Sequence, residues 1–276
     1  MPIKTILLCL SSPNSVASLL KAALPLARRF DAHLIGLHTL EALVVYPAIS
    51  MHIPDTVFVD FNKSQKAQAD EIKVIFERYT KSEDFIAEWR LQKPDTMTAT
   101  TRIMQSAQAA DLVIMAQDTD DEPYHDDLVG NTIRKSGRPV LIIPPDFRGD
   151  TIGDNILLGW SATRAATRAA HDLIAIATPE AAIGLLTIGK PGEGDIKTLD
   201  AVDLAETYAR HGLKPDILRR PNGKTVAETI LNEAAARGAD LIATGAVGRS
   251  RGYDLIIGAA TNDLLTTATL PVLYSR

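Results

Sequence analysis

Three apolar segments in the first half of the chain recur, in the same order, in the second half. The first segment of each copy ends in serine, the second begins with Ala-Asp, and the third begins with Pro-Val-Leu. The paired segments are residues 6–11 and 156–161, 110–115 and 239–244, and 139–143 and 271–275. A sequence that repeats in this way is typical of two copies of one structural unit. We therefore predict a tandem protein with units at residues 1–146 and 152–276, separated by a stretch rich in proline and glycine.

Within each unit, short apolar runs alternate with segments whose apolar residues recur at helical spacing. In the first unit we expect strands at 3–10, 33–40, 84–91, 112–115 and 139–143, and helices at 15–29, 65–80, 96–109 and from about 128. In the second we expect strands at 155–160, 182–187, 215–218, 241–244 and 272–275, and helices at 162–177, 196–211, 225–237 and 258–268. Such alternation favours parallel strands joined by right-handed crossovers. The expected fold class is α/β, with two tandem doubly wound units that carry helices on both faces of a parallel sheet.

The fifth strand of each unit has an apolar Pro-Val-Leu sequence and is expected at an edge of its sheet. Pairing the two fifth strands with each other would protect both edges. The sequence therefore predicts an intramolecular pseudo-dimer, and it leaves open whether two chains also form a homodimer. Residues 41–60 have no counterpart in the second unit and are interpreted as an excursion or lid.

Composition limits the classes of partner. The formal net charge is -5 and aromatic residues make up 5% of the chain, so neither nucleic acid nor an anionic membrane is an expected partner. The single cysteine, Cys9, lies in an apolar run and is expected to be a buried thiol. No apolar run approaches the roughly 20 residues of a membrane span, and no signal peptide is recognised. We expect a cytoplasmic protein.

The stretch 240–261 is the strongest candidate for a binding site. An apolar strand at 241–243 runs into a loop with several glycines, and an Ala/Thr/Leu-rich helix is expected to follow. Glycines allow an anion to approach the main chain, and the N–H groups and dipole of a helix N-terminus favour negative charge. Arg249 and Arg251 lie within the loop and could add positive charge. The alternative is a tight strand-to-helix turn that binds nothing.

The glycine spacing carries a family resemblance. Gly245, Gly248 and Gly258 match G-x2-G-x9-G, followed by Ala259 where a serine or threonine is usual. On these residues and on the repeat, the chain resembles a tandem universal stress protein. The resemblance implies two five-stranded parallel sheets of the adenine-nucleotide alpha-hydrolase-like fold. It also implies a stress-response protein whose second domain binds ATP or a related adenine nucleotide, with Mg2+ possible. Hydrolysis would be slow at most, and Asp254 is a candidate for it only by its position.

The resemblance also implies roles for individual residues of the second unit. The phosphates would lie against the main chain of the glycine loop and the first helical turn, with a hydroxyl donated by Thr261. Ser161 occupies the place where the family usually has aspartate, and this departure and Ala259 would both weaken binding. The implied nucleotide-binding set is Ser161, Leu186, Thr187, Thr244, Gly245, Gly248, Arg249, Gly258, Ala259, Ala260 and Thr261.

The equivalent loop of the first unit, 116–127, has no glycine and carries several carboxylates. Carboxylates would repel a triphosphate, so we predict that the first unit does not bind ATP in this way. His125 and its acidic neighbours would suit a divalent metal, but a solvated acidic loop is the preferred interpretation and no metal site is predicted. Two alternatives for the whole chain remain open: a nucleotide-free interaction scaffold, and a binder of another small anionic or lipid-like ligand near residues 41–60.

Overall fold

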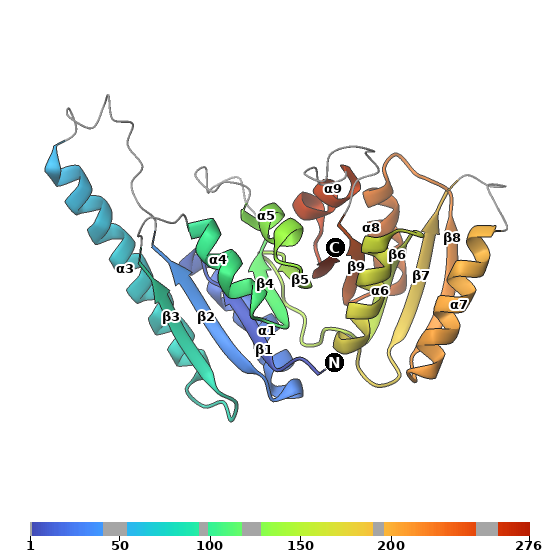
Figure 1. Ribbon diagram of the computed structural model, residues 1–276, viewed down its shortest axis with the longest axis horizontal. Helices are drawn as coiled ribbons and strands as arrows, with labels where there is room; N and C mark the ends of the chain where they lie inside the picture. The colour runs from blue at the N-terminus through green and yellow to red at the C-terminus, as the bar shows by residue number, and fades with distance from the viewer. Residues whose placement is uncertain (1, 41–53, 94–98, 118–127, 190–195, 247–258) are drawn as a thin grey trace.

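The computed structural model describes residues 2–40, 54–93, 99–117, 128–189, 196–246 and 259–276, and strands alternate with helices throughout these ranges (Figure 1). The first half contains β1 (Thr5–Cys9), α1 (Pro13–Phe30), β2 (His33–Thr39), α3 (Asp55–Thr80), β3 (Ala87–Gln92), α4 (Ala99–Gln108), β4 (Leu112–Ala116), α5 (Leu128–Lys135) and β5 (Val140–Ile143). The second half contains β6 (Asn155–Trp160), α6 (Arg164–Ile176), β7 (Ala182–Ile188), α7 (Ile196–Arg210), β8 (Lys214–Arg220), α8 (Val226–Arg237), β9 (Leu241–Gly245), α9 (Ala259–Thr267) and β10 (Val272–Ser275).

All ten strands lie in one sheet, in the order β3-β2-β1-β4-β5-β10-β9-β6-β7-β8. The strands within each half are parallel, and β5 pairs antiparallel with β10, Leu141 opposite Leu273. Each half is thus a doubly wound five-stranded unit, which confirms the expected α/β fold class. The strand order reverses between β1 and β4 and between β6 and β9, where such folds place ligands beyond the carboxyl ends of the strands.

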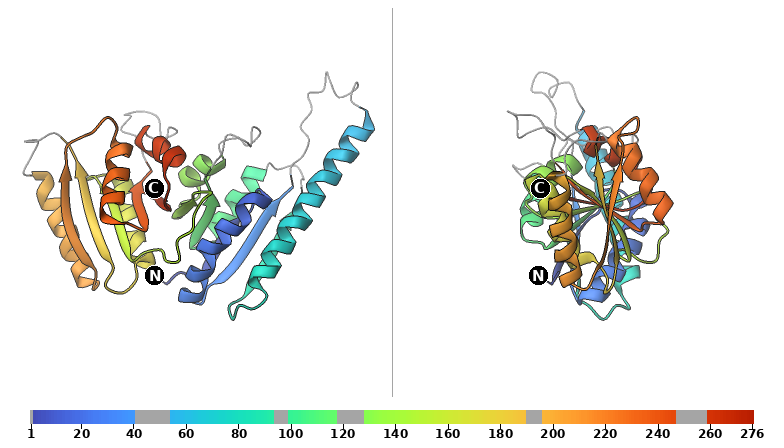
Figure 2. Two further views of the ribbon diagram at one scale, coloured as in Figure 1. Left: turned by 180° about the vertical axis from the view of Figure 1, so that it is seen from behind. Right: turned by 90° about the vertical axis from the view of Figure 1, so that its right-hand side faces the viewer.

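Helices cover both faces of the sheet, as the edge-on view shows (Figure 2). One core joins α1, α3, α6 and α7 to the first face, with Leu19, Phe76, Leu173 and Tyr208 fully buried. The second core joins α4, α5, α8 and α9 to the other face, with Ile133 and Leu264 buried. Successive apolar side chains of a strand point alternately into the first core and the second. Burial therefore selects one register for the paired strands.

The predicted elements are largely confirmed, with one clear error. The helix expected at 65–80 begins ten residues earlier, because α3 spans Asp55–Thr80. The early turns carry no buried side chain, and the first is Ala69, so the apolar pattern that marks a helix is weak there. Residues 55–60 are therefore helical and not part of an irregular excursion, while residues 41–53 lie outside the described ranges.

An aspartate links two strands in the same way in each half. Asp111, just before β4, accepts hydrogen bonds from the main-chain amides of Lys4 (2.9 Å) and Thr5 (3.0 Å) at the start of β1. Asp240, just before β9, accepts them from Gly153 (3.0 Å), Asp154 (2.8 Å) and Asn155 at the start of β6. Burial raises the pKa of Asp240, and the amide hydrogen bonds oppose that rise.

Arg29, in the last turn of α1, fastens the first half to the second. Its guanidinium donates to the carbonyl of Ile152 (3.2 Å), in the connecting segment, and to the carbonyl of Ile176 (2.5 Å), at the end of α6. Burial lowers the pKa of this guanidinium, while the charges of Asp154 and Asp240 act in the opposite direction. Arg29 therefore provides a charged donor for the C-terminal carbonyl of α6, in the other half.

We expect Arg29→Ala to lower the free energy of unfolding by about 2 kcal/mol, because hydrogen bonds from a charged donor to two carbonyls are lost. Urea denaturation followed by circular dichroism measures the change. Arg78→Ala, in the last turn of α3, is the matched control and should stay within about 0.5 kcal/mol. Equal stabilities of the two variants would show that the contact between Arg29 and the second half contributes nothing.

Candidate functional site

The candidate site lies at the carboxyl ends of β9, β6 and β7, which are neighbours in the sheet. Gly159 of β6 stands opposite Thr244 of β9, and Trp160 of β6 stands opposite Thr187 of β7. Ser161 directly follows β6. The fold therefore brings Ser161, Thr187 and the end of β9 to one edge of the sheet, at the reversal of strand order.

Gly245, the last residue of β9, is held close to the first turn of α6. A Cβ placed on Gly245 would clash with the main-chain nitrogen of Ala166 and would lie 2.5 Å from the carbonyl carbon of Ala165. Only glycine allows the helix to approach this strand so closely. Helix packing therefore accounts for this glycine whether or not a ligand is present. The next amide, of Ala246, donates to the carbonyl of Ser275 (2.9 Å).

Local hydrogen bonds fix the start of α6 beside this edge. Thr163 is the N-cap, and its hydroxyl oxygen accepts a hydrogen bond from the amide of Ala166 (3.3 Å). The hydroxyls of Ser161 and Thr163 are 3.3 Å apart. Satisfying an amide of the first turn in this way anchors the helix end. Ser161 is half-buried, so its hydroxyl lies at the boundary between the protein and solvent.

The remaining predicted residues have different environments. Leu186 is 1% exposed within the core on the α8 side, so a ligand at the edge would meet only its main chain. Ala259 and Ala260 form the start of α9, and Thr261 in the same turn is 5% exposed. Gly248, Arg249 and Gly258, with Arg251 and Asp254, lie outside the described residues.

At the corresponding edge of the first half, two side chains are buried. Leu10, which follows β1, is 2% exposed and His38 of β2 is 4% exposed. The ring nitrogen Nδ1 of His38 donates to the carbonyl of Leu10 (2.6 Å), and the ring stacks on Trp89 with centroids 6.4 Å apart. The acidic loop, with His125, lies outside the described residues, and within those residues no cluster of three potential metal ligands occurs.

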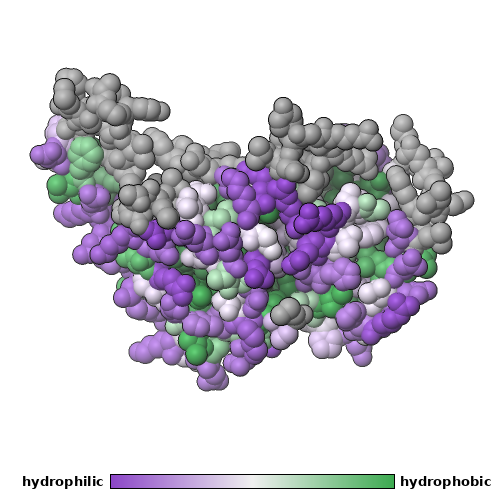
Figure 3. All heavy atoms as spheres, in the orientation of Figure 1, coloured by the Kyte–Doolittle hydropathy of each residue, from purple (hydrophilic) through white to green (hydrophobic). Residues whose placement is uncertain are grey.

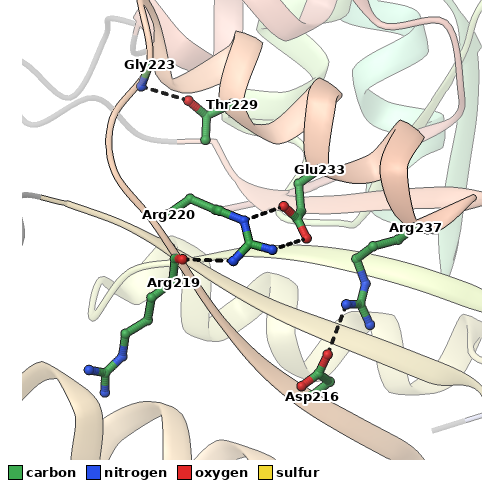
Figure 4. Close-up of polar contacts among 7 residues, drawn as sticks. All are labelled: Asp216, Arg219, Arg220, Gly223, Thr229, Glu233 and Arg237. Carbon is green, nitrogen blue, oxygen red and sulfur yellow. Dashed lines mark hydrogen bonds and ion pairs between the residues drawn. The ribbon is translucent and has the colours of Figure 1, made fainter.

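Two ion pairs hold β8 against α8 (Figure 4). Arg220 makes a bidentate contact with Glu233 of α8, at 2.7 and 2.9 Å. Arg237 of α8 contacts Asp216 at 2.9 Å. Sequence analysis missed both pairs, because a strand arginine and a helix glutamate show no spacing that would link them.

On the face of the molecule shown in Figure 3, hydrophobic side chains are interspersed with hydrophilic ones. None of the helices in the described ranges combines the length and the apolar character that crossing a membrane requires.

The topology defines a doubly wound α/β protein in which the strand order reverses once in each half of the sheet. Residues 154–276 match the model of the universal stress protein family. The second half of the chain is therefore similar to a universal stress protein domain. No curated protein matches the chain.

Three solved structures share the fold over nearly the whole chain. A universal stress protein from Archaeoglobus fulgidus DSM 4304 is 15% identical with a TM-score of 0.70, and the match covers 98% of each chain. A functionally unknown protein from Pseudomonas aeruginosa PAO1 is 18% identical with a TM-score of 0.62, covering 99% of this chain and 92% of that one. A putative universal stress protein from Pseudomonas aeruginosa UCBPP-PA14 is 17% identical with a TM-score of 0.60, covering 99% and 93%. At these identities the likeness establishes the fold.

Proposed function

We propose that the chain is a stress-response protein of the universal stress protein type, built from two such domains at residues 1–146 and 152–276. The family match over 154–276 supports the second domain. Two observations support the first half as another copy of the same domain: the repeated strand topology, and the equivalent contacts of Asp111 and Asp240. We further propose that the protein acts in the cytoplasm and that the fifth-strand pairing is its intramolecular pseudo-dimer contact.

The second domain, in this proposal, binds ATP or a related adenine nucleotide, which can carry Mg2+. The observation that supports it most is the convergence of Ser161, Thr187 and the end of β9 at the reversal of strand order. The main-chain amides at the start of α9 would face the phosphates, as helix N-termini do for anions. Thr261 would donate its hydroxyl, and hydrolysis, if it occurs, would be slow. The first domain would not bind ATP in this manner.

A thermal shift with ATP and Mg2+ tests this function. A ligand at 100 times its dissociation constant stabilises the folded protein by about 2.7 kcal/mol, which corresponds to a rise in melting temperature of about 5 °C for a chain of this size. The absence of a shift with any nucleoside triphosphate, and of nucleotide in the purified protein, would favour a nucleotide-free scaffold or a different small anionic ligand.

Thr261→Val should weaken ATP binding up to about tenfold, because a neutral hydrogen bond is lost while the shape of the side chain is kept. Thr266→Val, near the other end of α9, is the control: its hydroxyl is exposed and bonds only to main-chain carbonyls of its own helix. Isothermal titration calorimetry measures both. A loss that is equal in the two variants would contradict a role for Thr261 at the ligand.

A further inference from the structure

The ten-stranded sheet ends in two edge strands, β3 in the first half and β8 in the second (Figure 1). Among the residues that the structure describes, β3 pairs only with β2, and β8 pairs only with β7. The outer side of an edge strand offers N–H and C=O groups to another strand, unless proline or like charges prevent the pairing. The two edges differ in this respect.

The β8 edge is interrupted by proline. The amide of Lys214 donates to the carbonyl of Ala181 (2.8 Å), and the carbonyl of Arg220 accepts from Gly189 (3.3 Å), so the main-chain groups of Lys214 and Arg220 face β7. Successive residues of a strand direct their main-chain groups to opposite sides, which places Pro215 on the outer side. Proline has no N–H, so the outer row of donors is broken there.

The β3 edge has no such interruption. The amides of Leu34 and Leu40 donate to the carbonyls of Ile86 and Gln92, each at 2.9 Å, so the main-chain groups of Ile86 and Gln92 face β2. The residues that alternate with these direct their main-chain groups outwards, and no described residue bonds to those outer groups. They are Ala87, Trp89 and Leu91.

We propose that this edge is an interface at which a second copy of the chain adds its own β3, antiparallel, with Trp89 opposite Trp89 of the second copy. Ala87 of each copy then lies opposite Leu91 of the other. Each of these pairs joins two residues whose main-chain groups face outwards, so each exchanges both of its main-chain hydrogen bonds. Leu91, whose side chain is on the same face as that of Trp89, is 36% exposed and would pack on Ala87 of the second copy.

Charge complementarity selects this register. Glu88 falls opposite Arg90 of the second copy, in the pairs without main-chain hydrogen bonds, where side chains are closest. Glu88 and Arg90 now contact each other along one strand at 2.8 and 2.9 Å, and their side chains are 37% and 39% exposed. Moving the symmetry axis by one residue either way would keep the main-chain pattern but would set Glu88 opposite Glu88 or Arg90 opposite Arg90.

Helix α3 is compatible with the same symmetry. The ring of Phe76 lies 5.9 Å from that of Trp89, so α3 packs over this edge of the sheet. Tyr79 lines a cavity beside α1, and helical periodicity therefore directs Lys73 and Glu77 to the other side, towards the outer edge of β3. These two form an ion pair at 3.6 Å within the helix. In an antiparallel second copy of α3, Lys73 of one helix meets Glu77 of the other.

Analytical ultracentrifugation of the full chain tests the interface. The wild-type chain should sediment as a dimer at tens of micromolar concentration. Leu91→Pro removes an outward amide from both copies without removing a bond to β2, and it should raise the dimer dissociation constant at least tenfold. Arg219→Pro is the matched control, because it makes the same change at an outward position of β8, and it should sediment as the wild type does.

A charge series tests the register without proline. Glu88→Arg would set arginine opposite Arg90 at both symmetric positions and should raise the dissociation constant about tenfold. Combining Glu88→Arg with Arg90→Glu exchanges the charges and should restore the dimer. Circular dichroism checks that each variant is folded, and if Leu91→Pro is not, the charge series decides. A wild-type chain that stays monomeric, or a dimer that Glu88→Arg leaves unchanged, would overturn the proposal.

Discussion

Gly245→Ala is expected to lower the free energy of unfolding by about 3 kcal/mol, the upper part of the range for overpacking a rigid site. The new methyl group would meet the main chain of α6 at Ala165 and Ala166, and it would lie 2.9 Å from the Cβ of Ala165. Main-chain atoms in the first turn of a packed helix cannot move aside as the end of a flexible side chain can. Urea denaturation at neutral pH measures the loss.

Gly189→Ala is the matched control. Gly189 follows β7 at the same edge of the sheet, and a Cβ there would have no heavy atom of a described residue within 4 Å. Its stability should stay within about 0.5 kcal/mol of the wild type. If Gly245→Ala were as stable as Gly189→Ala, the close approach of α6 to the end of β9 would be wrong. If it were stable but unable to bind ATP, Gly245 would serve the ligand and not the packing.

Much of the fold could be predicted from the sequence because the buried elements carry strong local patterns. The apolar runs of β1, β4, β6 and β9 identify strands, and the repeat gives their order twice. The start of α3 could not be predicted in this way, since its early turns bury no side chain. The helix propensity of the residues is by itself a weak signal. Contacts between distant elements, such as Arg29 with the end of α6, leave no local pattern at all.

The candidate site illustrates the same limit. The glycine spacing identified Gly245, but only the packing of α6 shows a reason for that glycine that needs no ligand. The register that aligns Trp160, Thr187 and Arg219 could not be predicted, because β6 and β8 are connected in the sheet only through β7. Leu186 was predicted, and the structure shows its side chain in the core. A motif thus locates the edge, whereas strand register determines which side chains share it.

Arg220→Ala is expected to lower the free energy of unfolding by about 3 kcal/mol, because it leaves a buried carboxylate without its cation. Glu233 is 8% exposed, and both its oxygens are bound by the Arg220 guanidinium at the end of β8. Since Arg220 itself is partly exposed, water can reach the gap, which places the loss at the lower end of the range for buried pairs. Urea denaturation measures it without adding a competing guanidinium salt.

Arg219→Ala is the control on the same strand, because the Arg219 side chain has no partner among the described residues and its loss should change stability by no more than about 0.5 kcal/mol. Replacing both members of the pair, as in Arg220→Leu with Glu233→Leu, should recover most of the loss, since an apolar pair of similar size often substitutes for a buried ion pair. If the single variant Arg220→Ala were as stable as Arg219→Ala, Glu233 would have to be solvated in the folded protein. In that case the ion pair would not be what holds the end of β8 against α8.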